Sequence, residues 1–96
     1  MNTMITNNQL AERFEIACGK SVAFLEYKVI GRLMTLAHTE VPEDLGGKGL
    51  GGELVRFAFE HAKRNNLKVV AHCEFAHSYI LRHKEYSSLL QQDQGK

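Results

Sequence analysis

The sequence predicts a single mixed α/β domain, in which antiparallel strands are followed by a β-α-β crossover and a short C-terminal helix. Three observations support this fold class. The first half contains extended segments with alternating apolar residues, a run of glycines precedes a segment with helical periodicity, and a short β-branched segment follows that helix. A chain of 96 residues has room for one modest core, so we expect one domain over residues 1–96.

The antiparallel part is predicted from three extended segments. Residues 13–18 and 21–27 flank Gly19-Lys20, which is typical of a two-residue hairpin turn that begins with glycine. A third extended segment covers residues 32–41, and Pro42 ends it because proline has no N–H to donate to a neighbouring strand. Three antiparallel strands are therefore expected first.

The crossover is predicted from a change of periodicity after the glycines. Leu54, Ala58 and Ala62 recur at helical spacing, and Asn65-Asn66 is a plausible end of the helix. Residues 67–73 then read as a buried strand parallel to the third one. A shorter helix over about 76–83 and a final turn containing Tyr86, Leu89 and Leu90 complete the fold, and residues 1–10 and 91–96 are expected to be flexible tails.

Composition excludes several classes of protein. Twelve Lys and Arg residues balance eleven Asp and Glu residues without any basic block, so no nucleic-acid partner is expected. The N-terminus has neither a basic region nor an apolar run of the kind found in signal peptides, which predicts a cytoplasmic protein without a membrane partner. Two cysteines, Cys18 and Cys73, are too few for a disulfide framework, so both are expected to be reduced.

The glycine-rich stretch 47–52 formally satisfies the G-x-G-x-x-G pattern, and its place before a helix suits a phosphate or pyrophosphate. A dinucleotide site would need this loop directly after the first strand of a β-α-β series, although Glu74 has suitable spacing for the acidic partner. A nucleotide-triphosphate loop would need Ser or Thr where Gly49 follows Lys48. A structural turn that only lets helix and strand approach remains an alternative.

The order of strand, "VPEDLGGKGLGGEL", helix, strand and short helix resembles the acyl-CoA-binding core of the GNAT superfamily of N-acyltransferases over residues 35–86. Gly49 and Gly51 match the glycine positions of the superfamily signature, while Gly46 replaces its usual Gln or Arg. The strings "HTEVP", "GKGLG" and "HCEFAHSYILRHKEY" further resemble a small stand-alone GNAT-like family of about one hundred residues.

This resemblance implies that acetyl-CoA is the co-substrate and that an unidentified primary amine, such as one of a protein or peptide, is the acceptor. No metal is expected to take part. The resemblance implies that the backbone of Thr39, Glu40 and Val41 pairs with the pantetheine arm and the acyl carbonyl. It also implies that the pyrophosphate is held by the amides of Gly46, Gly47, Lys48, Gly49, Leu50, Gly51 and Gly52, with added charge from Lys48.

Cys73 is the first catalytic candidate, because it ends a strand just ahead of a helix, where a helix N-terminus favours the thiolate. A buried structural cysteine is the alternative reading. The resemblance favours a functional role, with direct transfer of the acetyl group to the amine preferred over an acetyl-cysteine intermediate.

Tyr79 and His38 are the other catalytic candidates. Many GNAT enzymes place a general-acid Tyr on the helix after the crossover strand, but alignment on Cys73 puts Ile80 there and Tyr79 beside it. His38 shares a strand face with Glu40, and either side chain is a candidate base or a solvated surface group. A zinc site is not expected from His72, Cys73, His77 and His83, because they lack a familiar ligand spacing.

Two other functions stay open. A coenzyme A-binding module would bind without turnover, and a structural interaction domain would not bind coenzyme A. Full-length superfamily members have additional N-terminal helices that wall the acceptor pocket, whereas this sequence starts directly at the predicted hairpin. The acceptor groove is therefore expected to be open. The protein is expected to be a monomer or weak homodimer.

Overall fold

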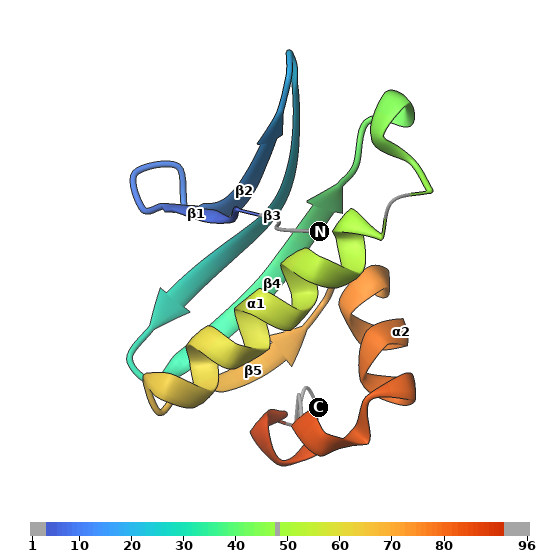
Figure 1. Cartoon of the computed structure of the whole chain (residues 1–96). Helices are drawn as coiled ribbons and strands as arrows, with labels where there is room; N and C mark the ends of the chain where they lie inside the picture. Colours follow the sequence, from blue (N-terminus) through green and yellow to red (C-terminus); the bar gives the residue numbers. More distant parts are fainter. Residues whose placement is uncertain (1–3, 48, 92–96) are drawn as a thin grey trace.

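The computed structural model describes residues 4–47 and 49–91 (Figure 1). Its strands are β1 (Thr6–Asn8), β2 (Arg13–Cys18), β3 (Ser21–Ile30), β4 (Leu33–Glu40) and β5 (Lys68–Ala71). The helices are α1 (Leu50–Arg64) and α2 (Glu74–Arg82), with short 3₁₀ helices η1 (Glu43–Leu45) and η2 (Lys84–Leu89).

The five strands form one sheet in the order β1-β2-β3-β4-β5. Strands β1 to β4 pair antiparallel, and β5 pairs parallel to β4 after the crossover through α1, which confirms the predicted mixed architecture. Strand β1 was not predicted: residues 6–8 were expected to belong to a flexible tail, and instead they pair with the outer edge of β2. Its sequence, Thr-Asn-Asn, has little β-propensity, so the pairing comes from the neighbouring strand.

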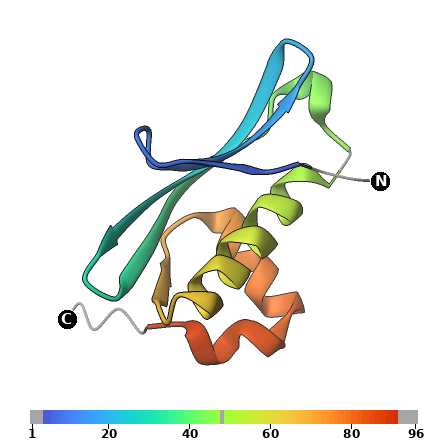
Figure 2. The same ribbon diagram turned by 60° about the vertical axis from the view of Figure 1, so that its left-hand side comes forward.

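Both α-helices lie on the same face of the sheet, and the opposite face carries no helix in the described residues (Figures 1 and 2). Alternate residues of β2, β3 and β4 point into the layer between sheet and α1, as expected from the period of two in a strand. The largest fully buried side chains are Phe14, Phe59, Leu25, Met34, Leu36, Leu54, Val55 and Val69. The core therefore joins the sheet to α1 and fixes the N-terminal end of that helix.

Local backbone geometry explains where the elements end. Gly19 has φ +62°, as the predicted glycine-first hairpin turn requires, because L-residues with a side chain seldom adopt this conformation. Asn66 has φ +56° just beyond α1, so the Asn-Asn stop is confirmed. The second helix begins earlier than predicted, at Glu74, which makes Cys73 its N-cap residue.

A β-bulge interrupts β4 at Ala37. Leu36 pairs with Tyr27, whereas His38 pairs with Glu26, so Ala37 is the extra residue of β4 at this point. Beyond the bulge, Thr39 pairs with the buried Leu25 and so shares the core face, while His38 lies on the uncovered face. Unbroken alternation from Leu36 would place His38 on the core face and Thr39 on the uncovered face. The bulge therefore exchanges the faces of these two side chains.

Among residues 4–47 and 49–91, neither α-helix is long and apolar enough to cross a membrane.

Candidate functional site

The glycine stretch forms a loop that ends at the first turn of α1. Gly47 and Gly49 have φ +78° and +72°, a left-handed conformation that favours glycine, and Gly49 is the N-cap residue. Gly49 has no side chain with which to cap the helix, and the N–H of Glu53 donates to the carbonyl oxygen of Gly49 at 3.1 Å. The amides of the first turn have no partner within the helix and are available to an anion. Lys48 lies outside the described residues.

Segment 42–46 anchors this loop to the sheet. The hydroxyl of Ser21, at the β2–β3 turn, donates to the carboxylate of Asp44 at 2.6 Å. Leu45 is buried, and the N–H of Gly46 donates to the carbonyl oxygen of Glu43 at 3.0 Å. The loop is therefore attached at one end to η1 and at the other to α1, whose apolar side chains pack in the core.

Strands β4 and β5 separate immediately after Leu36. Their parallel pairing ends at Leu36 and Ala71, and the carbonyl oxygen of Leu36 accepts from the N–H groups of both His72 and Cys73, at 3.0 and 3.2 Å. Within the described residues, positions 38–40 of β4 pair only with β3, and Ala37 of the bulge pairs with neither neighbouring strand. Their backbone groups on the β5 side therefore border an opening rather than another strand.

A hollow of about 390 Å³ occupies this opening and is called the Cys73 hollow below. It is lined by Ala37, His38, Thr39, His72, Cys73, Glu74 and Phe75. The sulfur of Cys73 lies 2.9 Å from the hydroxyl oxygen of Thr39, across the gap between the separated strands. Two residues predicted for different roles, Thr39 by its backbone and Cys73 by its thiol, are thus joined through their side chains.

His38 lines the same hollow from the uncovered face of the sheet. Its Nε2 lies 3.2 Å from Oε1 of Glu40, and both side chains are more than half exposed. The predicted sharing of a face by these two residues is confirmed. An exposed imidazole beside a carboxylate is suited to accept a proton from an amine that enters the hollow from this side.

Tyr79 does not line the Cys73 hollow. Its ring stacks on His83 at 4.1 Å between ring centroids and lies near Phe59 and Tyr86, between α1 and α2. Burial raises the pKa of Tyr79, so the phenol is protonated at neutral pH. The residue has the protonation state of an acid, but its place in this aromatic group serves packing. Ile80, its neighbour, is buried.

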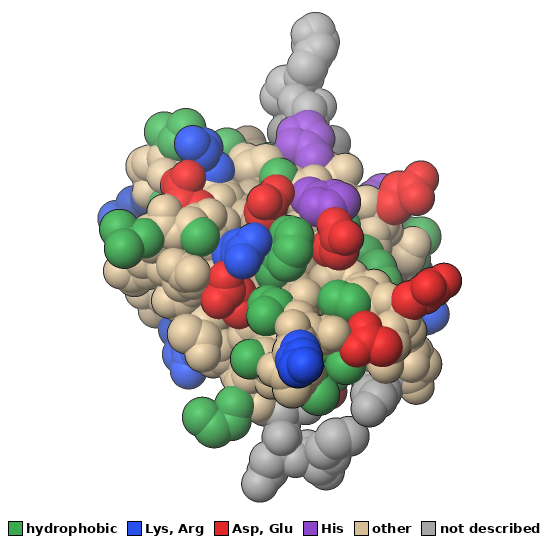
Figure 3. Space-filling model, turned by 90° about the horizontal axis from the view of Figure 1, so that it is seen from above, with side chains coloured by type: hydrophobic (Ala, Val, Ile, Leu, Met, Phe, Trp, Pro, Cys, Tyr) green, Lys and Arg blue, Asp and Glu red, His purple; other side chains and the backbone are tan. Residues whose placement is uncertain are grey.

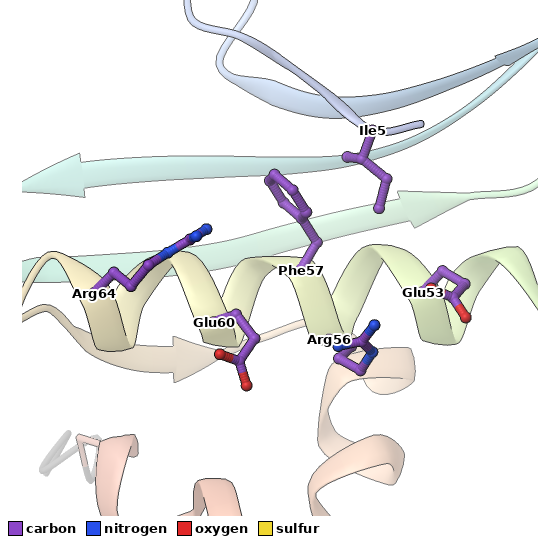
Figure 4. A pocket seen from close by; sticks show the side chains of 6 residues that line it. All are labelled: Ile5, Glu53, Arg56, Phe57, Glu60 and Arg64. Atoms are coloured by element: carbon purple, nitrogen blue, oxygen red, sulfur yellow. The ribbon is translucent and has the colours of Figure 1, made fainter. Parts of the chain in front are cut away.

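Another hollow lies away from this site. A hollow of about 350 Å³ runs along α1, where Phe57 and Ile5 approach one another and the charged side chains of the helix surround them (Figure 4). None of the predicted site residues lines it. In the described part of the chain, no three His, Cys, Asp or Glu side chains gather as metal ligands would.

Acidic and histidine side chains lie close together on the surface seen from above (Figure 3). At the Cys73 hollow itself, the lining residue His38 is paired with Glu40, and Glu74 adds a carboxylate to the lining. These carboxylates favour a neutral or cationic group over an anion as a ligand of the Cys73 hollow.

Sequence reasoning missed the side-chain contact between Thr39 and Cys73, and it used Phe75 only as the aromatic residue after the cysteine in the GNAT-like string, without a role in the site. The contact depends on the bulge at Ala37, and neither glycine nor proline marks that position in the sequence. Phe75 carries an aromatic side chain one residue into α2, which is a signal of packing rather than of a site.

Comparison with known proteins agrees with this geometry. A sequence model of the family described as GCN5-related N-acetyl-transferase matches residues 13–89. A GCN5-like protein from Staphylococcus aureus, with a solution structure determined by NMR, is 28% identical and superimposes with a TM-score of 0.73. The match covers 97% of this chain and 92% of that one. On the strength of the family match and the shared fold, this chain belongs to the GCN5-related N-acetyltransferase family.

Proposed function

We propose that the protein binds acetyl-CoA and transfers the acetyl group to a primary amine. The observation that carries this proposal is the opening between β4 and β5, which has free helix amides at one end and the thiol of Cys73 at the other. One end suits a pyrophosphate and the other a thioester, as coenzyme A requires.

The binding roles follow from the backbone. The amides of Gly51 and Gly52, in the first turn of α1, would hold the pyrophosphate, with those of Gly47 and Gly49 beside them, whereas the N–H of Gly46 is already engaged by the carbonyl oxygen of Glu43. Residues 39–41 would pair with the pantetheine arm and hold the acyl carbonyl, because β5 no longer occupies that edge. The closure of this edge by an extended ligand resembles the addition of a strand to a sheet.

The chemistry is nucleophilic attack of the amine nitrogen on the thioester carbonyl carbon, which forms a C–N bond and breaks the C–S bond. The leaving sulfur takes the electron pair and then a proton, and the nitrogen loses one. In our proposal His38 accepts the proton from the amine, because its ring borders the hollow. Cys73, held by Thr39, positions the reacting amine in direct transfer.

The acceptor would enter from the uncovered face of the sheet. A second hollow of about 440 Å³ lies on that face and shares Ala37 with the Cys73 hollow. Its charged lining comprises Glu12, Glu26 and Lys28, so negative charge predominates. An amine that is cationic in solution is attracted to such a surface before it loses its proton.

A coenzyme A-binding module without turnover is the second candidate. The observation that favours it is the position of Tyr79 outside the Cys73 hollow, because no phenol then lies beside the leaving sulfur. The two candidates differ in turnover and not in binding.

Turnover is tested by following release of the coenzyme A thiol from acetyl-CoA in the presence of lysine-containing peptides and small polyamines. We expect release with at least one acceptor, a large loss in Cys73→Ala, and no loss in Cys18→Ala, since Cys18 is exposed. Binding of acetyl-CoA without release would support the binding module. Accumulation of acetyl-Cys73, detected by intact mass, would overturn direct transfer.

A further inference from the structure

The ring of Phe75 packs on the bare backbone of Gly51. A Cβ added at Gly51 would lie 2.2 Å from Cζ and 2.6 Å from both Cε1 and Cε2 of Phe75. These distances are far below any normal contact, so the phenyl ring occupies the space that a side chain at position 51 would need. Gly52, one residue further along α1, has only ordinary contacts, with Tyr79 at 3.7 Å and beyond.

The same distances show how the ring is oriented. An edge-on approach to Cζ would leave both Cε atoms much farther away than Cζ, whereas the three distances are similar. The face of the ring is therefore turned towards the α-carbon of Gly51. Phe75 nevertheless remains 43% exposed, so the contact with Gly51 is a local one at the edge of the core.

This contact lies between the two ends of the proposed coenzyme site. Gly51 belongs to the first turn of α1, where the pyrophosphate would bind. Phe75 also lines the hollow that holds Cys73, and it lines a second hollow with Ser78 and Arg82 along α2. An arm that reaches from the amides of α1 to Cys73 has to pass beside this ring.

We propose that Phe75 is a coenzyme-contacting residue whose ring leaves Gly51 when the pantetheine arm enters. This inference rests on the proposed function, because it assigns the ring a place on the path of coenzyme A. In the free protein the ring covers the backbone of Gly51 and narrows access to Cys73. In the complex the arm contacts the Gly51 backbone that the ring has left, which explains why a residue without a side chain occupies position 51.

The first test measures how fast the thiol of Cys73 reacts in the absence of coenzyme A, in a single-cysteine protein made by Cys18→Ser. We expect Phe75→Ala to raise the rate of Cys73 alkylation by iodoacetamide several-fold. Leu81→Ala is the matched control, because Leu81 lies on the same helix and is 61% exposed, and it should leave the rate unchanged. An unchanged rate in Phe75→Ala would show that the ring does not restrict access, and would overturn the proposal.

The second test observes the ring by NMR. The Gly51 α-proton that faces the ring should resonate upfield in the free protein, and it should return towards its ordinary shift in Phe75→Leu or when coenzyme A is added. Phe75→Leu should also associate with coenzyme A several-fold faster than the unaltered protein. If coenzyme A binds and the Gly51 α-proton stays at its upfield position, this proposal fails while the proposed function stands. If coenzyme A binds neither protein, both proposals fail.

Discussion

The substitutions Gly51→Ala and Gly52→Ala should differ in their effect on stability, although both remove a glycine from the first turn of α1. Alanine in place of helical glycine stabilises a protein by about 0.5–1 kcal/mol. At Gly52 the new methyl group meets Tyr79 at 3.7 Å, an ordinary contact, so we expect this full gain.

At Gly51 the same gain is offset, because the Cβ of the new alanine would lie only 2.2 Å from Cζ of Phe75. The ring has to leave the helix. Full burial of a Phe side chain contributes about 1.5–3 kcal/mol. Since Phe75 is already 43% exposed, giving up the rest of this contact costs about 1 kcal/mol. Gly51→Ala should therefore be neutral or slightly destabilising.

Urea unfolding followed by circular dichroism measures the difference, which should be about 1 kcal/mol between the two variants, or about 4–8 °C in Tm for a domain of this size. In a Phe75→Ala background, Gly51→Ala should stabilise by the same amount as Gly52→Ala, because the ring is gone. Equal stabilisation by both substitutions in the unaltered protein would refute the contact between Phe75 and Gly51.

Three further outcomes are expected. Burial raises the pKa of Tyr86 to about 12 from an ordinary 10.0, so the stability that its neutral phenol confers is complete below pH 10 and is lost as pH rises towards 12. Over this pH range the unfolding midpoint should fall less in Tyr86→Phe than in the unaltered protein, and parallel plots of midpoint against pH would contradict this. Burial lowers the pKa of His61 below 6.5, so the stability that its neutral ring contributes is present above pH 6.5 and is lost as pH falls. A midpoint above 6.5 in an NMR titration of His61 would contradict this direction. Thr39→Val, which keeps the shape but removes the hydroxyl, should change the rate of Cys73 alkylation in the single-cysteine protein, while Thr39→Ser should preserve it. Identical rates in all three proteins would mean that the 2.9 Å contact has no chemical effect.

The helical crossover was predictable because its signals are local and repeated. The spacing of Leu54, Ala58 and Ala62 gives one apolar stripe, and Asn66 ends the helix through its left-handed backbone. The parallel strand that follows was predictable because a short β-branched run after a helix has few other places in a small α/β domain. These elements fix the ends of the candidate site.

The bulge at Ala37 was not predictable, because nothing in the residues around it distinguishes an extra residue from regular alternation. With the bulge, Thr39 rather than His38 lies opposite Leu25 on the core face, and Val41 beyond it packs against the core. The consequence is specific: Thr39, expected to act through its backbone, directs its hydroxyl to Cys73.

Tyr79 shows the limit of placing a side chain by its distance along the chain. Because α2 starts at Glu74, Ala76, Tyr79 and Ile80 form its buried side and Tyr79 packs towards α1. Ile80, the position that alignment on Cys73 selects, lies on the same buried side, and neither residue lines the Cys73 hollow.

The central claim, that the opening between β4 and β5 is an acetyl-CoA site, is tested most directly by titrating the protein with acetyl-CoA and following amide chemical shifts. We predict that the largest shifts fall on residues 39–41 and 49–52, at the two ends of the opening. No movement at millimolar ligand, or movement confined to the hollow along α1 near Phe57, would contradict the account.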